Sequence, residues 1–312
     1  GVAFIGMAIA MKLDPAIAAG AIVSGAYFGD KLSPLSETTN LAAAVTETDL
    51  FTHIRHLLWT TIPSFVIAIS LFIFIGGEVS LSSEESIQAT MAGLQENYAI
   101  GIHLLLPAVI LCAMAWGGIP ALPSIALAAL IGGLFAIVFQ REALITFVNN
   151  PALNLAEQYL IGVWTALFNG YSINSDNEAL NNLLSRGGMS SMLNTVWIIL
   201  CAMAFGSVME KIGLLERLLR AILNSVEKTA GLIIATVFTC IGTNIITADQ
   251  YISIVLPGRM FRLEYKRRGL ASQNLSRTLE DAGTLTSALI PWNTCGVFMA
   301  GTLGVATLDY IP

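Results

Sequence analysis

The sequence predicts an all-α membrane protein: a polytopic helical bundle with inverted repeats, a re-entrant hairpin and two discontinuous helices. Three observations support this fold class. Of the 312 residues, 55% are hydrophobic and only 12% are charged, and the mean hydropathy is +0.73. Several apolar runs approach the roughly 20 residues that cross about 30 Å of hydrocarbon. Polar segments interrupt apolar stretches near both ends of the chain.

The first predicted domain, residues 1–77, contains one discontinuous helix. Asp14 and Pro15 suit the N-cap and the first position of a helix. We expect, in order, a hairpin arm at 1–13, a helix from Pro15 to Phe28, a polar break at 29–40, a half-helix from Leu41 toward Asp49 and a span at 57–75. The missing first hairpin arm suggests an internal part of a longer protein.

The second predicted domain, residues 78–228, connects the two repeats. Its start, 78–97, holds four glutamates and no Lys or Arg. We then expect spans at 98–116 and 119–139 around a Gly117-Gly118 turn, mixed amphipathic pieces at 141–191 with a polar loop at 171–182, a span at 192–209 and a basic amphipathic segment at 211–228.

The third predicted domain, residues 229–312, contains the second repeat. We expect an apolar segment at 231–260 interrupted at 242–244 and 247–249, a basic loop at 259–277, and a helix at 281–308 broken at 291–294. The positive-inside rule places both basic segments in the cytoplasm and the acidic stretch outside. The segment between the basic loops is then a re-entrant hairpin with Thr243, Asn244 and Asp249 at its tip.

The two broken helices acquire opposite orientations in this topology. Such inverted repeats are the architecture that many secondary transporters use for alternating access. Charges and open backbone at membrane depth persist mainly where they line a protected site, so the breaks predict an ion or substrate pathway. The candidate ion- and proton-binding residues are Asp30, Ser33, Thr38, Thr39, Asn40, Thr243, Asn244, Asp249, Asp281, Thr284, Asn293 and Thr294.

Oxygen ligands suit a hard cation, and we expect Asp30, Asn40, Asn244 and Asn293 to contact Na⁺. A desolvated carboxyl group retains its proton, whereas a nearby cation displaces it, so Asp30, Asp249 or Asp281 would exchange the two. Lys31 is a candidate counter-charge. The alternatives are that Asp30 and Asn40 form a structural cap, that Asp249 and Asp281 are helix caps, that Lys31 only neutralises Asp30 or snorkels, and that Glu37 faces water.

Two histidines, His53 and His56, stand at the predicted cytoplasmic boundary. Histidine titrates near neutral pH, so both are candidates for pH sensing, and interfacial anchoring is the alternative. Trp292 lies in the second break, where its side chain would line the site.

Four motifs of this sequence are specific enough to compare with known families. They are Ser24-Gly25-Ala26-Tyr27-Phe28-Gly29-Asp30-Lys31-Leu32-Ser33-Pro34-Leu35-Ser36-Glu37-Thr38-Thr39-Asn40, residues 49–56, residues 184–189 and the run from Thr284 through Pro291-Trp292-Asn293-Thr294 to Gly296. These motifs resemble the NhaC-type sodium/proton antiporters of the ion-transporter superfamily. The resemblance implies a sodium-coupled, multi-pass transporter of the cytoplasmic membrane. The same family includes proteins that resemble malate/lactate exchangers.

We therefore expect exchange of Na⁺ for H⁺ by alternating access, with no cofactor beyond the transported ions. A sodium-coupled organic-acid antiporter that takes small carboxylates is the first alternative, and a channel or non-transporting membrane component is the second. A soluble enzyme and a nucleic-acid partner are excluded by composition. The expected partners are Na⁺, H⁺ and the lipid bilayer, and a homodimer is left open.

Overall fold

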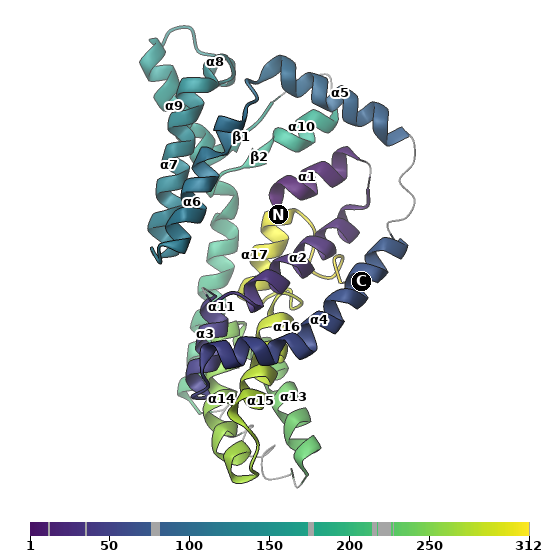
Figure 1. The fold of residues 1–312 in the computed structure, drawn as a ribbon. Helices are drawn as coiled ribbons and strands as arrows, with labels where there is room; N and C mark the ends of the chain where they lie inside the picture. Colours follow the sequence, from purple (N-terminus) through teal and green to yellow (C-terminus); the bar gives the residue numbers. More distant parts are fainter. Residues whose placement is uncertain are drawn as a thin grey trace. The chain divides into compact units, whose positions relative to one another are not determined.

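The computed structural model describes residues 1–11, 13–34, 36–75, 82–173, 178–213, 217, 226 and 228–311. Regular structure in these residues is almost entirely helical (Figure 1). Helices long and apolar enough to cross a membrane are Leu50–Ile75, Leu122–Phe139, Met189–Met209 and Thr229–Thr247. The predicted all-α, multi-pass membrane fold is confirmed. The chain divides into two units, which are described separately.

The first unit comprises Gly1–Ile5, Asp14–Glu78 and Asn194–Pro312. Helix α1 (Val2–Ala10) is divided between the two units. All candidate site residues lie in the first unit. Its elements are α2 (Pro15–Lys31), α3 (Glu37–Val45), α4 (Leu50–Ile75), α11 (Leu193–Lys211), α13 (Thr229–Thr247), α14 (Gln250–Arg267), α15 (Ser272–Leu279), the π-helical turn η3 (Glu280–Thr284), α16 (Leu285–Ser287) and α17 (Thr294–Leu303).

The first discontinuous helix is present, but its break is shorter than predicted. The Asp14 carboxylate accepts a hydrogen bond from Ala16 N at 2.8 Å, which confirms the predicted N-cap. The helix continues past Phe28 because the chain breaker is Pro34, which also disfavours helical backbone in the residue before it. Helix α3 then begins at Glu37 instead of Leu41 because the extended Ser36 already serves as its N-cap residue.

The predicted hairpin consists of α13 and α14, which pack against each other. The predicted interruption at residues 242–244 is wrong, because α13 is continuous to Thr247. A glycine costs a helix only about 1 kcal/mol, and the Asn244 side chain bonds to another element and so does not compete for its own backbone. The second predicted interruption is correct: Ala248 has φ 56°, and the Asp249 side chain caps α14.

The second discontinuous helix begins earlier than residue 281. It runs from Ser272 through α15, η3 and α16 to Ser287, breaks at residues 288–293 and resumes as α17. Asp281 therefore lies in a π-helical turn inside a helix and is not an N-cap. The predicted basic loop at 259–277 is mostly helical, since Arg and Lys are good helix formers. Arg268 and Arg267 bond to Glu264 at this end of α14 and hold the pKa of that carboxyl below its usual value.

Helices α13, α14 and α15 lie side by side and enclose the apolar core of this unit (Figure 1). The core includes Leu232, Ile254, Phe261, Tyr265 and Leu279, each at most 1% exposed. Helix α3 packs on α14 and joins the same cluster. Because lipid is as apolar as a leucine side chain, close packing rather than exclusion of water stabilises such helix contacts.

The second unit comprises Gly6–Leu13 and Val79–Leu193. Helices α6, α7, α8 and α9 pack in succession, and a two-residue antiparallel pair joins Gly170 to Gly187. Its elements are α5 (Ser82–Asn97), η1 (Ile102–Leu105), α6 (Leu106–Trp116), α7 (Ala121–Phe139), α8 (Arg141–Val148), α9 (Leu155–Asn169), β1 (Gly170–Tyr171), α10 (Glu178–Leu184), β2 (Arg186–Gly187) and η2 (Met189–Met192).

The predicted span at 98–116 is helical from Ile102 to Trp116, as η1 and α6, so its helix begins four residues later than the sequence predicts. The helical segments Met91–Asn97 and Ile102–Met114 meet at 92° across a short break. The predicted Gly117-Gly118 turn is present, and Gly118 has φ 73°, which favours glycine. The start of the acidic stretch, the centre of the 171–182 loop and most of the basic 211–228 segment lie outside the described residues.

Gly296 provides a test of the second break. A Cβ added there would lie 2.1 Å from the Ile290 carbonyl oxygen, which belongs to the backbone of the break. We expect Gly296→Ala to destabilise the protein by about 1–3 kcal/mol, because overpacked positions must shift their neighbours. Thermal unfolding in detergent measures the change. Gly242→Ala is the control because a Cβ there meets nothing within 4 Å, and equal melting temperatures for the two variants would contradict this packing.

Candidate functional site

The first helix break satisfies much of its own backbone with side chains from α3. Asn40 Nδ2 donates to the carbonyl oxygens of Pro34 at 2.8 Å and Ser36 at 2.7 Å. Thr39 Oγ1 donates to the Lys31 carbonyl at 3.2 Å. Ser33 lies within the break, where its backbone N–H donates to the Asp30 carbonyl at 3.0 Å. These bonds replace the helical ones that the break removes, as membrane-embedded backbone requires.

The π-helical turn η3 contacts this first break through two carboxylates. The buried Lys31 ammonium forms an ion pair with Asp281, whose side chain is 26% exposed. Thr38 Oγ1 donates to Glu280 Oε1 at 3.0 Å and lies 3.1 Å from Ser36 Oγ. Residues about 250 positions apart in sequence thus share one polar cluster, and π turns of this kind occur frequently at functional sites.

The second helix break is stabilised by neutral amides from the hairpin. Asn293 Nδ2 donates to Asn244 Oδ1 at 3.1 Å, and Asn244 Nδ2 donates to the Gly283 carbonyl at 2.6 Å. Thr294 N donates to the Ala248 carbonyl at 3.0 Å, and Trp292 Nε1 donates to a carbonyl of α13 at 2.8 Å. The tip of the hairpin therefore contacts the N-terminus of α17.

Asp249 lies at the same tip and caps α14. Its Oδ1 accepts a hydrogen bond from Ile252 N at 2.9 Å, and the residue is 7% exposed. Thr243 is buried one turn earlier in α13, and its carbonyl accepts a bond from the Thr247 hydroxyl at 2.8 Å. The capping geometry matches the alternative that the sequence left open for Asp249.

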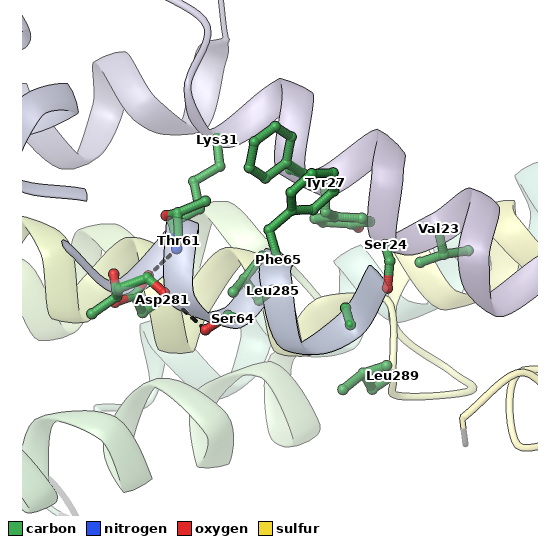
Figure 2. Close-up of a pocket in the computed structure, with 13 residues that line it drawn as sticks. Val23, Ser24, Tyr27, Lys31, Thr61, Ser64, Phe65, Asp281, Leu285 and Leu289 are labelled. Atoms are coloured by element: carbon green, nitrogen blue, oxygen red, sulfur yellow. Dashed lines mark hydrogen bonds and ion pairs between the residues drawn. The ribbon is translucent and has the colours of Figure 1, made fainter. Parts of the chain in front are cut away.

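Two cavities flank the polar cluster. The first, of about 520 Å³, has Lys31 and Asp281 at one end, with hydroxyls of α4 beside them (Figure 2). The rest of its lining is mostly apolar but includes Ser24 and Tyr27. Figure 2 shows Lys31 of α2 extending toward Asp281, with Thr61 and Ser64 nearby. The second cavity, of about 480 Å³, is lined by Asp30 and Thr294 together with Tyr27, Gln250 and Tyr251. Asp30 is thereby brought to the same space as the second break.

Glu37 is exposed, and its carboxylate accepts a hydrogen bond from Tyr251 at 2.7 Å. Tyr27 OH lies 3.3 Å from Ser287 Oγ, which connects α2 to α16. These contacts tie the first discontinuous helix to α14 and to the second discontinuous helix. The tyrosines are polar groups of this region that the sequence reasoning did not select.

The two candidate pH-sensing histidines contact α15. His53 is completely buried, and its Nδ1 lies 2.8 Å from Ser276 Oγ. His56 Nε2 lies 3.0 Å from Asn274 Oδ1. Both side chains thus link α4 to the helix that leads into the π turn, so a change in their charge would act on that helix.

Glu280 is the most important residue that the sequence reasoning missed. It is 0% exposed, and Thr284, one turn onward, is 1% exposed. The adjacent acidic pair Glu280-Asp281, directly before the small and hydroxyl residues Ala282-Gly283-Thr284, was a usable signal. It was overlooked because the helix was expected to begin at residue 281.

Comparison with known proteins agrees with the sequence motifs. The model of the Na⁺/H⁺ antiporter family matches residues 25–312. The Na⁺/H⁺ antiporter NhaC of Alkalihalophilus pseudofirmus is 41% identical over 312 residues, which cover 100% of this chain and 64% of that protein. No solved structure matches the chain.

Two further relatives have names that include organic solutes. The malate-2H⁺/Na⁺-lactate antiporter of Bacillus subtilis is 34% identical over 315 residues, 100% of this chain and 64% of that protein. The arginine/ornithine antiporter ArcD of Halobacterium salinarum is 34% identical over 316 residues, 100% of this chain and 62% of that protein. The chain spans just under two thirds of the length of these relatives. Since the family model covers nearly all of its residues, the chain belongs to the Na⁺/H⁺ antiporter family.

Proposed function

We propose that the protein exchanges Na⁺ for H⁺ across the cytoplasmic membrane, with sodium leaving and protons entering. The observation that carries this proposal is the cluster in which Lys31 pairs with Asp281 at the first helix break. Ionisable groups inside a membrane protein are costly and mark ion pathways. The cluster joins a discontinuous helix to a π turn. Small rearrangements there would change which groups face each side of the membrane.

The chemistry of exchange requires a carboxylate that holds either a proton or a cation. Asp281 and Asp30 are the acidic candidates on the two cavities. Hydroxyl and amide oxygens from Thr38, Thr39 and Asn40 lie at the first break, and those from Asn244, Asn293 and Thr294 lie at the second. Oxygen donors of these kinds suit a hard cation such as sodium.

Alternating access is supported by the arrangement of the two discontinuous helices. We place residues 1–77 in a first repeat and 229–312 in an inverted second repeat, with the segment between them as a connection. Half-helix ends direct partial charges toward a central site in transporters of this type. If one repeat rocked against its partner, the cluster would be exposed alternately to the two sides of the membrane.

A sodium-coupled exchange of organic acids is the second candidate function. Cavities of about 520 and 480 Å³ fall within the range that binds small organic molecules. The Lys31 ammonium at the end of the larger cavity would attract a carboxylate, provided that Asp281 releases it. One relative is named for malate and lactate exchange, and another for arginine and ornithine.

Transport assays separate the two candidates. The full-length protein is reconstituted into vesicles that contain a pH-sensitive dye, and sodium is added outside with or without malate. We expect sodium alone to move protons, with choline chloride inactive. Proton movement that requires malate would instead establish the organic-acid exchange and reject cation-only antiport.

Asp30→Asn tests whether the carboxylate on the smaller cavity takes part. We expect exchange to fall at least tenfold, because an amide cannot hold a proton in competition with sodium. The same dye assay measures it, and Asp309→Asn is the matched control. Exchange at the wild-type rate in a correctly folded Asp30→Asn protein would remove Asp30 from the pathway.

A double variant separates the structural role of the ion pair from its role in transport. Lys31→Met alone leaves Asp281 without its partner. Removing one member of a buried pair costs about 3–5 kcal/mol, and we expect a loss near the lower end because Asp281 is 26% exposed. Adding Asp281→Leu should restore the melting temperature, because apolar replacement of both partners is often neutral. We expect neither the single nor the double variant to exchange Na⁺ for H⁺. Restored stability together with restored exchange would show that the pair is only structural.

A further inference from the structure

Glu280 has an unsatisfied oxygen in a fully enclosed position. Its Oε1 accepts the Thr38 hydroxyl at 3.0 Å, whereas Oε2 has no hydrogen-bond partner in the described part of the chain. The Thr284 hydroxyl oxygen is also buried and makes no hydrogen bond of ordinary length, although it lies close enough to the Glu280 carboxyl group to interact with it. Glu280 and Thr284 lie at the two ends of the same π-helical turn.

Such a carboxylate requires a neutralising partner. Removing an ionised carboxylate from water without a compensating charge is strongly unfavourable. The Lys31 ammonium, which acts electrostatically on Glu280, is itself paired with Asp281. Two partners remain that leave no trace in the protein's own contacts: a proton on the carboxyl group, or a cation held beside it.

The surroundings of the turn supply oxygen ligands and little charge. Helix α13, which packs on the turn, has no Asp, Glu, Lys or Arg and presents the titratable Cys240. Helix α16 has no ionisable group, and the first half of α14 has only Tyr251. The remaining ionisable groups on elements around the turn are Tyr27, Asp30 and Lys31 of α2, Glu37 of α3, His53, Arg55 and His56 of α4, Arg259, Arg262, Glu264, Tyr265, Lys266 and Arg267 in the second half of α14, Arg277 of α15 and Asp281 itself.

The turn is also tightly confined. A Cβ at Gly283 would lie 3.0 Å from both Ser253 Oγ and Ile254 Cγ1, so α14 is in close contact with it. Glu280 lines neither of the two cavities described above. A small dehydrated ion fits such a position better than an organic solute does.

We propose that Glu280, Thr284 and Thr38 form a dehydrated binding site for a monovalent cation, in which Na⁺ and a proton replace one another. The carboxylate contributes charge, and the two hydroxyls contribute neutral oxygen ligands. This inference rests on the proposed sodium exchange and assigns its central carboxylate to Glu280.

Equilibrium binding of ²²Na⁺ to the purified full-length protein in detergent tests the site without requiring transport. The wild-type affinity should weaken as the pH falls, because protons compete for the same carboxylate. Glu280→Gln should bind sodium at least tenfold more weakly, without that pH dependence. Glu142→Gln is the control, because it makes the same substitution at a solvent-exposed glutamate. Its sodium affinity and pH dependence should match those of the wild type. Wild-type affinity and pH dependence in Glu280→Gln would overturn the inference.

Thr284→Val provides a second test if Glu280→Gln fails to fold. Valine keeps the shape of threonine and removes an unpaired hydroxyl, so a purely structural role predicts an equal or higher melting temperature with or without sodium. Sodium should raise the melting temperature of the wild-type protein, because it binds the folded state. We expect that it does not raise the melting temperature of Thr284→Val. Thr302→Val removes another unpaired hydroxyl, on α17, and should retain the sodium effect. A full sodium effect in Thr284→Val would reject the site.

The two proposals fail in different ways. A wild-type protein that does not exchange Na⁺ for H⁺ in vesicles would contradict the proposed function. A wild-type protein that exchanges normally, together with a Glu280→Gln variant that binds sodium normally, would contradict only the Glu280 site. Glu280→Asp should retain pH-dependent competition at reduced affinity, and complete loss of that competition would also count against a carboxylate site.

Discussion

The ion pair between Lys31 and Asp281 is the interaction on which the arrangement of the polar cluster depends. It connects the last turn of α2 to the π turn that lies across from it, and the lysine side chain is only 3% exposed. Neither charge is tolerable alone in a low-dielectric interior. The pair therefore holds the first helix break against the second discontinuous helix, and it leaves the neighbouring Glu280 without a basic partner among the described residues.

The two helix breaks are stabilised by different chemistry, which suggests different roles. Side chains of α3, chiefly Asn40 and Thr39, satisfy the first break locally, and its charges face the π turn. The second break relies on Asn244 and on the carbonyl of Ala248 from the hairpin, so its contacts are neutral. We interpret the first break as the ionisable part of the pathway and the second as the support that positions it.

Much of this fold follows from local sequence signals. Pro34 and Pro291 lie in the two breaks, where proline removes a helical hydrogen bond, although Pro63 and Pro257 lie inside continuous helices. Ala248-Asp249 marks the hairpin tip through a helix cap. The π turn has no comparable local signal, and the pairing of Lys31 with Asp281 depends on packing between distant segments. The acidic pair Glu280-Asp281 is visible in the sequence, but the complete burial of Glu280 depends on that packing, so the sequence alone does not distinguish it from Asp281.

The central claim is that one enclosed site holds either sodium or a proton. Sodium-induced proton release from the purified full-length protein, in weakly buffered detergent solution with a pH indicator, tests it most directly. The account predicts that sodium chloride releases protons in an amount proportional to the protein concentration, and that choline chloride releases none. Sodium binding without any proton release would contradict it.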